Sequence, residues 1–253
     1  MRIENFPAIV TGGGSGLGRA TAEALAASGC RVAVLDRNAD AAYSVAESIR
    51  GIACVCDVTD SASTEAAIAA ARSAHGAARI IVNCAGIGTP GRVVGRDGPL
   101  PMEMFERVVR VNLFGTFNVL RLAAAGLQAL EPLEDGERGV IINTASVAAF
   151  DGQIGQAAYA ASKGAVVAMT LPIARELARS GIRVVTIAPG LFHTPLMDTL
   201  PAEVQQSLAA SVPFPQRLGR PAEFAAMVLS IVSNSFFNGE TIRLDGALRM
   251  APR

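Results

Sequence analysis

One tyrosine and one lysine are spaced so that they could act as an acid/base pair. Lys163 is the only lysine of a chain with twenty-one arginines, and it follows Tyr159 by four residues. Residues four positions apart share one face of a helix, so the phenol and the ammonium would point into the same space. An arginine, a rigid planar fork with a pKa too high to tune, could not replace this lysine. Because a phenol beside an ammonium loses its proton more easily, the pair predicts an enzyme.

A glycine cluster near the N-terminus has the spacing of a phosphate-binding loop. The segment 11–18, TGGGSGLG, follows a short apolar run and leads into a helical pattern. Gly12, Gly16 and Gly18 would let a diphosphate approach the backbone, while the helix would offer free N–H groups. A strand before the loop, a helix after it and an acidic residue near position 36 are the context that a dinucleotide site requires. We therefore predict such a site rather than a simple tight turn.

Acidic and small residues follow the next predicted strands. The Asp36 carboxylate could accept hydrogen bonds from both hydroxyls of the adenosine ribose and would repel a 2′-phosphate, which favours NAD over NADP. Arg37 follows directly and could pair with a phosphate, so this choice stays open. Asp57 and Val58 are placed to meet the adenine ring, and segment 83–86 brings backbone close to the cofactor. All lie at carboxyl ends of strands, where open α/β sheets bind ligands.

Short β-branched runs alternate with longer helical patterns along the whole chain. The strands are apolar throughout, which indicates a parallel sheet covered on both faces. We predict a single α/β domain over residues 1–253, with a Rossmann-like, doubly wound parallel sheet of about seven strands. The expected strands are 8–10, 31–35, 52–56, 80–82, 139–143, 183–187 and 241–244, and the expected helices are 18–28, 39–50, 61–75, 102–129, 157–180 and 221–232.

Two long connections interrupt this alternation. Residues 88–101 form a Gly/Pro-rich loop insertion with Arg92 and Arg96, and residues 191–220 form a mostly apolar excursion. Long connections in compact domains are usually functional or disordered. The second is too apolar for a solvated linker, so we predict a lid over an apolar substrate.

Composition narrows the remaining classes. The chain has 253 residues, zero net charge and only 17% charged residues. Without a basic stripe, nucleic acid is not an expected ligand. The low charge indicates that other subunits cover part of the surface, although an alanine-rich soluble protein is an alternative. We expect the four cysteines to be reduced thiols that bind no metal. No leader segment is evident, and the uncharged apolar runs are interrupted or too short to span a bilayer. We therefore expect a cytoplasmic protein without a membrane partner.

The motifs T-G-x-x-x-G-x-G, N-C-A-G, Ser146, Tyr159-x-x-x-Lys163 and Pro189-Gly190 together resemble the short-chain dehydrogenase/reductase family, over essentially the whole chain. The resemblance implies that Tyr159 removes the substrate hydroxyl proton, and that Lys163 lowers its pKa and binds the nicotinamide ribose. Ser146 would hold the substrate oxygen. Asn112 would anchor a water relay to Lys163, unless it is an ordinary polar residue of a helix.

The same resemblance implies which residues surround NAD and substrate. Around NAD it places Gly12, Ser15, Gly16, Leu17, Gly18, Asp36, Asp57, Val58, Cys84, Ala85, Gly86, Tyr159, Lys163, Pro189, Gly190, Phe192 and Thr194. Substrate would contact Ser146, Gln156 and Tyr159. Thr194 could instead cap a helix, and Gln153 and Gln156 could simply complete their loop. His193 stands where close relatives have glycine, and it could alter the lid or be a surface residue.

Segments 139–150, 155–159, 169–175 and 186–192 further resemble family members that act on 3-hydroxyacyl-CoA. This resemblance implies NAD-dependent oxidation of 3-hydroxyacyl-CoA to 3-oxoacyl-CoA in fatty-acid or branched-chain metabolism, by a homotetramer. Arg92 and Arg96 could then meet a CoA phosphate or remain solvated. The alternatives are a hydroxysteroid dehydrogenase, a 3-oxoacyl reductase and a non-catalytic NAD-binding scaffold.

Overall fold

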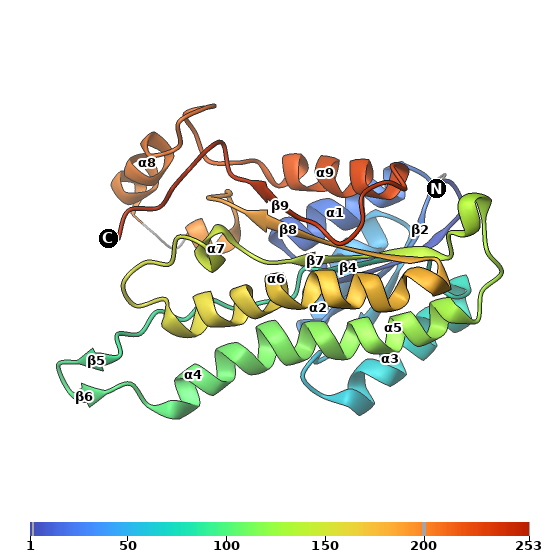
Figure 1. Cartoon of the computed structure of the whole chain (residues 1–253), viewed down its shortest axis with the longest axis horizontal. Coiled ribbons are helices and arrows are strands. Elements are labelled where there is room, and N and C mark those ends of the chain that lie inside the picture. The colour runs from blue at the N-terminus through green and yellow to red at the C-terminus, as the bar shows by residue number, and fades with distance from the viewer. Residues whose placement is uncertain (2, 199–200, 253) are drawn as a thin grey trace.

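A seven-stranded parallel sheet forms the centre of the computed structural model, which describes residues 1, 3–198 and 201–252 (Figure 1). The strand order is β3-β2-β1-β4-β7-β8-β9. Successive strands are added on one side of β1 up to β3 and on its other side from β4 onward, so the strand order reverses between β1 and β4. This confirms the predicted fold class, and ligands of such sheets bind at that reversal. The strands are β1 (Pro7–Thr11), β2 (Arg31–Asp36), β3 (Ile52–Val55), β4 (Ile80–Asn83), β7 (Gly139–Thr144), β8 (Ile182–Pro189) and β9 (Thr241–Leu244).

Helices cover both faces of the sheet, as its apolar strands require. Val10 faces a core shared with helices α1, α2 and α9, whereas Ile9 faces a core shared with α3, α5 and α6. The alternation of neighbouring residues therefore builds two cores from one strand. The helices are α1 (Gly16–Ala27), α2 (Ala39–Ser48), α3 (Ser61–His75), α4 (Met102–Val109), α5 (Thr116–Gln128), α6 (Ala157–Leu177), α7 (Pro195–Asp198), α8 (Ala202–Ala210) and α9 (Pro221–Ser233).

Three segments differ from the sequence-based expectation. The helix predicted over 102–129 is interrupted by a π-helical turn at Arg110–Gly115, which separates α4 from α5. The loop 88–101 contains a small antiparallel hairpin, and the segment 191–220 contains α7 and α8. The hairpin strands are β5 (Val94–Gly95) and β6 (Gly98–Pro99), and short 3-10 turns lie at Glu134–Gly136, Val147–Ala149 and Ala178–Ser180.

Two helical stretches are long and apolar enough to span a membrane by length and composition alone, namely Met102–Gln128 and Ala157–Ser180. Both stretches contain charged residues, such as Arg121 and Lys163, so they do not contradict the expectation that every uncharged apolar run is interrupted or too short. The α5 part of the first stretch and the α6 part of the second pack against the sheet in the α3, α5 and α6 core (Figure 1). Core helices of layered α/β proteins meet the same two criteria, because the core is as apolar as a bilayer.

Candidate active site

The carboxyl ends of β1, β2, β4, β7 and β8 open into one cavity of about 1010 Å³. This volume is at the upper end of the range of ligand pockets. Its walls contain the predicted cofactor residues Gly12, Ser15, Gly16, Leu17, Gly18, Asp36, Asp57, Val58, Cys84, Ala85, Gly86, Tyr159, Lys163, Pro189, Gly190, Phe192 and Thr194, together with Ser146 and Gln156. The topology therefore brings together residues from six widely separated parts of the sequence.

The glycine loop fits a diphosphate because side chains are excluded there. Gly12 has φ +61°, and a Cβ on it would lie 2.8 Å from the backbone nitrogen of Ala85. A Cβ on Gly18 would collide with the carbonyl oxygen of Gly12. The loop consequently lies close to both β4 and α1, and the N-terminus of α1 presents its N–H groups at the cavity wall.

Asp36 is held at the end of β2 by its neighbours' backbone. Its Oδ2 accepts a hydrogen bond from the Gly14 N–H at 3.0 Å, and its Oδ1 accepts one from the Asn38 N–H at 2.9 Å. Arg37 is exposed and also lines the cavity. Both groups that bear on the choice of cofactor are therefore present at one wall.

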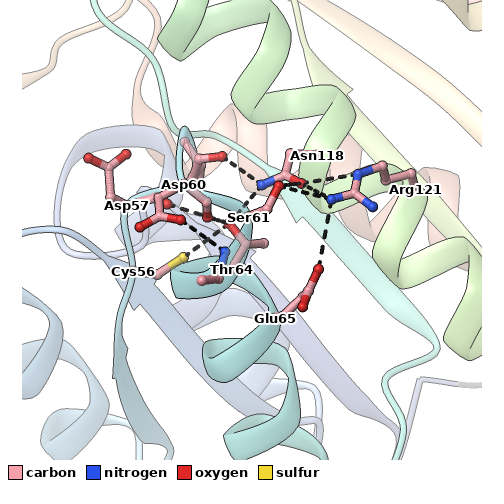
Figure 2. A network of polar contacts seen from close by, with 10 residues as sticks. Cys56, Asp57, Asp60, Ser61, Thr64, Glu65, Asn118 and Arg121 are labelled. Carbon is pink, nitrogen blue, oxygen red and sulfur yellow. Dashed lines mark hydrogen bonds and ion pairs between the residues drawn. The ribbon is translucent and has the colours of Figure 1, made fainter.

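A polar network fixes the segment after β3 that carries Asp57 and Val58 (Figure 2). Asn118 on α5 donates from Nδ2 to the Val58 carbonyl and to Thr64 Oγ1, each at 3.0 Å. Its Oδ1 accepts from Ser61 and from Arg121, whose guanidinium closes the network at the surface. The Asp57 carboxylate accepts two hydrogen bonds from Thr59, which lower its pKa. Asn118, which no sequence motif marks, thus supports the cavity-lining residues Asp57 and Val58 without lining the cavity itself.

Lys163 is buried beside Tyr159 on α6. Its Nζ lies 5.8 Å from the centroid of the Tyr159 ring and donates a hydrogen bond to the Thr144 carbonyl at 2.7 Å. Burial lowers the pKa of Lys163 to about 8, and the nearby Cys84 opposes this shift. A buried ammonium with this pKa can support a phenolate and exchange protons near neutral pH.

The pKa of Tyr159 differs from the sequence-based expectation. Burial raises it above its ordinary value, although the hydrogen bond with Ser146 acts in the opposite direction. Removing the phenol from water penalises the phenolate more than the surrounding polar groups compensate. Ser146 is itself oriented, because its Oγ accepts a hydrogen bond from the Ala148 N–H at 3.1 Å.

Asn112 lies in the π-helical turn and, among the predicted site residues, does not line the cavity. Its side chain is fully buried and clamps Ile87, accepting from the N–H at 2.8 Å and donating to the carbonyl at 2.9 Å. It also donates to Ser162 on α6. A Cβ on Gly86 would lie 3.2 Å from Asn112 Oδ1 and 3.4 Å from Lys163 Nζ, so Gly86 gives both residues room. Asn112 therefore positions the chain beside Lys163, and the water relay stays a prediction.

The substrate side is lined by Gly88, Thr89, Pro90, Gln153, Gln156, Leu191, Met197 and Met250. Gln156 Oε1 accepts a hydrogen bond from the Gln153 N–H at 3.1 Å, so Gln156 completes its loop and also reaches the cavity. Arg92 and Arg96 are exposed on the hairpin segment and do not line the cavity, so their contact with a CoA phosphate stays a prediction beside the alternative of solvated charges.

Two other arginines, Arg107 and Arg110, line the cavity instead. Sequence reasoning missed them because they lie in a helical stretch with no phosphate motif. Their place five and two residues before Asn112 was the available signal. Among the described residues, no three His, Cys, Asp or Glu side chains gather to hold a metal ion.

The two ends of the predicted lid, residues 191–220, are hydrogen-bonded to each other. Phe192 and Gly219 form a parallel β-bridge, in which the His193 N–H donates to the Gly219 carbonyl and the Gly219 N–H donates to Leu191, both at 2.8 Å. The buried Phe192 ring packs edge-on against Phe224 of α9. His193 borders a separate small cavity with Arg19 and Glu23 rather than the main one. Thr194 immediately precedes α7 and lines the main cavity.

Comparison with known proteins places these features in one family. The chain is 52% identical over 255 residues to 3-hydroxyacyl-CoA dehydrogenase type-2 of Bos taurus, with 99% of this chain and 97% of that protein covered. The crystal structure of 3-hydroxyacyl-CoA dehydrogenase type-2 from Mycobacterium avium superposes with a TM-score of 0.93 at 43% identity, covering 98% of both chains. A 7α-hydroxysteroid dehydrogenase complexed with NADH and 7-oxo glycochenodeoxycholic acid has a TM-score of 0.89 at 32% identity, with 100% and 97% covered.

The sequence profile of the short chain dehydrogenases matches residues 7–205. This range includes the glycine loop, Asp36, Ser146, Tyr159 and Lys163. Since the match extends over most of the chain, the chain belongs to the short-chain dehydrogenase family.

Proposed function

We propose that this chain is an NAD-dependent dehydrogenase that oxidises 3-hydroxyacyl-CoA to 3-oxoacyl-CoA in fatty-acid or branched-chain metabolism. The observation that carries the proposal is that Ser146, Tyr159 and Lys163 line the same cavity as the glycine loop and Asp36. The likeness to proteins named 3-hydroxyacyl-CoA dehydrogenase type-2 supports the substrate class.

The residues divide the reaction among them. The glycine loop and α1 would hold the diphosphate of NAD, and Asp36 would hold the adenosine ribose. When bound, NAD accepts a hydride from the substrate carbon. Ser146 and Tyr159 would hold the substrate hydroxyl oxygen, and Tyr159 would take its proton as the carbonyl forms. Lys163 would stabilise the phenolate form of Tyr159, which is the form that can accept this proton.

A substrate panel tests this proposal. Purified protein is supplied with NAD and 3-hydroxybutyryl-CoA, free 3-hydroxybutyrate or a simple secondary alcohol, and NADH formation is followed by absorbance. We expect the highest kcat/KM for the CoA ester, because binding energy from the remote CoA moiety aligns the reacting carbon. Equal kcat/KM for the ester and the free acid would contradict the substrate assignment.

A hydroxysteroid dehydrogenase is the second candidate. The likeness to the 7α-hydroxysteroid dehydrogenase and the apolar lid residues Leu191 and Met197 support it. Brisk oxidation of a hydroxysteroid without acyl-CoA oxidation would favour this candidate. A 3-oxoacyl reductase would instead show a higher kcat/KM with NADH and the oxo compound, and a scaffold would bind NAD without turnover.

We also propose a homotetramer in a reducing, cytoplasmic environment. Phe114 and Phe117 are 56% and 47% exposed on neighbouring turns, and Leu171 of α6 is 44% exposed. Apolar side chains gathered on surface helices support burial by another subunit. The four thiols are free, and the pKa values of Cys30 and Cys84 are raised to about 11 by burial, as suits unreactive reduced cysteines. Light scattering of wild type and of Phe114→Glu measures the assembly, and an unchanged mass for the variant would contradict this interface.

A further inference from the structure

Met250, in the last described segment of the chain (249–252), lines the cavity although no sequence motif had indicated it. Met250 lines the cavity together with Gln153 and Gln156, which precede Tyr159. Figure 1 shows the C-terminal end on the same side of the molecule as α7, α8 and the start of α6. The tail therefore meets the substrate side of the site rather than the side of the glycine loop.

Hydrogen bonds to the carbonyl groups of the tail hold it in this place. The Ile154 N–H donates to the Pro252 carbonyl, and Gln153 Nε2 donates to the Ala251 carbonyl, both at 3.0 Å. These bonds connect the tail to the loop that presents Gln153 and Gln156 to the cavity. The hydrogen bonds of Ala251 and Pro252 thus hold Met250 in position at the cavity wall.

One guanidinium fixes the base of the tail and the substrate loop together. Arg243 of β9 donates to Asp151 Oδ2 at 2.6 Å, to Asp245 Oδ2 at 2.7 Å and to the Leu248 carbonyl at 2.9 Å. Its guanidinium also lies 5.1 Å from the centroid of the Phe150 ring. Leu248, just before the tail, is 2% exposed and anchors the chain in the interior. The tail and the loop 150–156 therefore share a single anchor on the sheet.

We infer that the C-terminal tail sets the substrate range of the enzyme, with Met250 limiting how far the acyl chain extends from the reacting carbon. The inference rests on the proposed function for the identity of the substrate. Met250 is apolar and unbranched, and its thioether adapts to an alkyl chain. Each methylene that gains or loses burial against it changes kcat/KM by about fourfold.

The test measures kcat/KM for 3-hydroxybutyryl-CoA, 3-hydroxyoctanoyl-CoA and 3-hydroxydodecanoyl-CoA in wild type and four variants. Met250→Ala enlarges the pocket and should raise the ratio of long-chain to short-chain kcat/KM by about tenfold, whereas Met250→Trp should lower it by about tenfold. The matched control is Arg249→Ala, since Arg249 lies on the same tail but is exposed and does not line the cavity. It should leave the ratio and the KM for NAD unchanged.

A parallel series of secondary alcohols of increasing chain length separates this inference from the proposed function. If wild type oxidises no acyl-CoA, the proposed function fails, and the alcohol series still reports the length dependence. If both Met250 variants keep the wild-type ratio in the series that is turned over, the tail does not set the substrate range. Variants are compared only after melting curves show cooperative unfolding. Met250→Leu nearly preserves the side-chain volume and should keep the wild-type ratio of long-chain to short-chain kcat/KM.

Discussion

The buried amide of Asn118 offers a way to perturb cofactor binding without touching the cofactor. In Asn118→Ala, the Val58 carbonyl and Thr64 Oγ1 both lose a donor that lies at 3.0 Å. Asn118 is 7% exposed, so water cannot readily replace it. Each hydrogen bond contributes about 1 kcal/mol net, and an unsatisfied buried carbonyl costs about 1–3 kcal/mol. We expect a loss of about 2–4 kcal/mol in the free energy of unfolding.

Part of that loss should appear in NAD binding, because the freed segment carries Asp57 and Val58 at the cavity wall. If NAD binding must reorder the segment at a cost of about 1–2 kcal/mol, the KM for NAD rises about 5- to 30-fold. The kcat at saturating NAD should change by less than about threefold, because the hydrogen bonds of Asn118 go to Val58, Thr64, Ser61 and Arg121 and not to the catalytic pair.

Steady-state kinetics and chemical denaturation measure the two effects separately. The control is Arg121→Ala, which removes the exposed partner of the same network and the weak ion pair with Glu65 at 4.0 Å. Exposed pairs contribute less than about 1 kcal/mol, so this variant should keep its KM for NAD within about twofold. An unchanged KM for NAD in Asn118→Ala, or equal changes in both variants, would refute the reasoning.

Four further predictions concern the chemistry. Tyr159→Phe should lower kcat at least ~10²-fold with nearly unchanged NAD binding by fluorescence titration, and near wild-type turnover would exclude Tyr159 as the base. Because burial raises the pKa of Tyr159, the phenolate increases as pH rises, so log kcat/KM for alcohol oxidation should climb through the alkaline range; a flat profile would contradict this. Burial lowers the pKa of Lys163 from its ordinary value of 10.5 to about 8, so below pH 8 the folded state bears the cost of a buried ammonium. Lys163→Met should therefore be more stable than wild type at pH 7. In thermal melts, this difference in stability should shrink as pH rises from 8 towards 10.5. Wild type should prefer NAD over NADP by about 10² in kcat/KM, and Asp36→Ala should narrow that ratio; equal use by wild type would instead implicate Arg37.

The layered sheet and much of the site were accessible from the sequence because local signals define them. Apolar runs marked the seven strands, and glycines marked the places where the backbone approaches β4 and α1. The π-helical turn carries no local signal, since it accompanies the contact of Asn112 with Ile87, twenty-five residues away in the chain. Asn118 and Met250 were missed for the same reason, because their roles depend on contacts between distant segments. The direction of the Tyr159 pKa shift required the degree of burial, which spacing along a helix does not reveal.

The β-bridge at the base of the lid bears on how such an enzyme can change over evolutionary time. Phe192 and Gly219 bring the two ends of the lid together, and the Phe192 ring is fixed against α9. Because the ends are already joined, insertions or deletions between them alter the loop-closure free energy only slowly with length. Neither β8 nor α9 has to move. The lid can therefore be exchanged or lengthened as a unit, so new substrates can be acquired while the sheet, the dinucleotide loop and the catalytic pair stay under unchanged constraints.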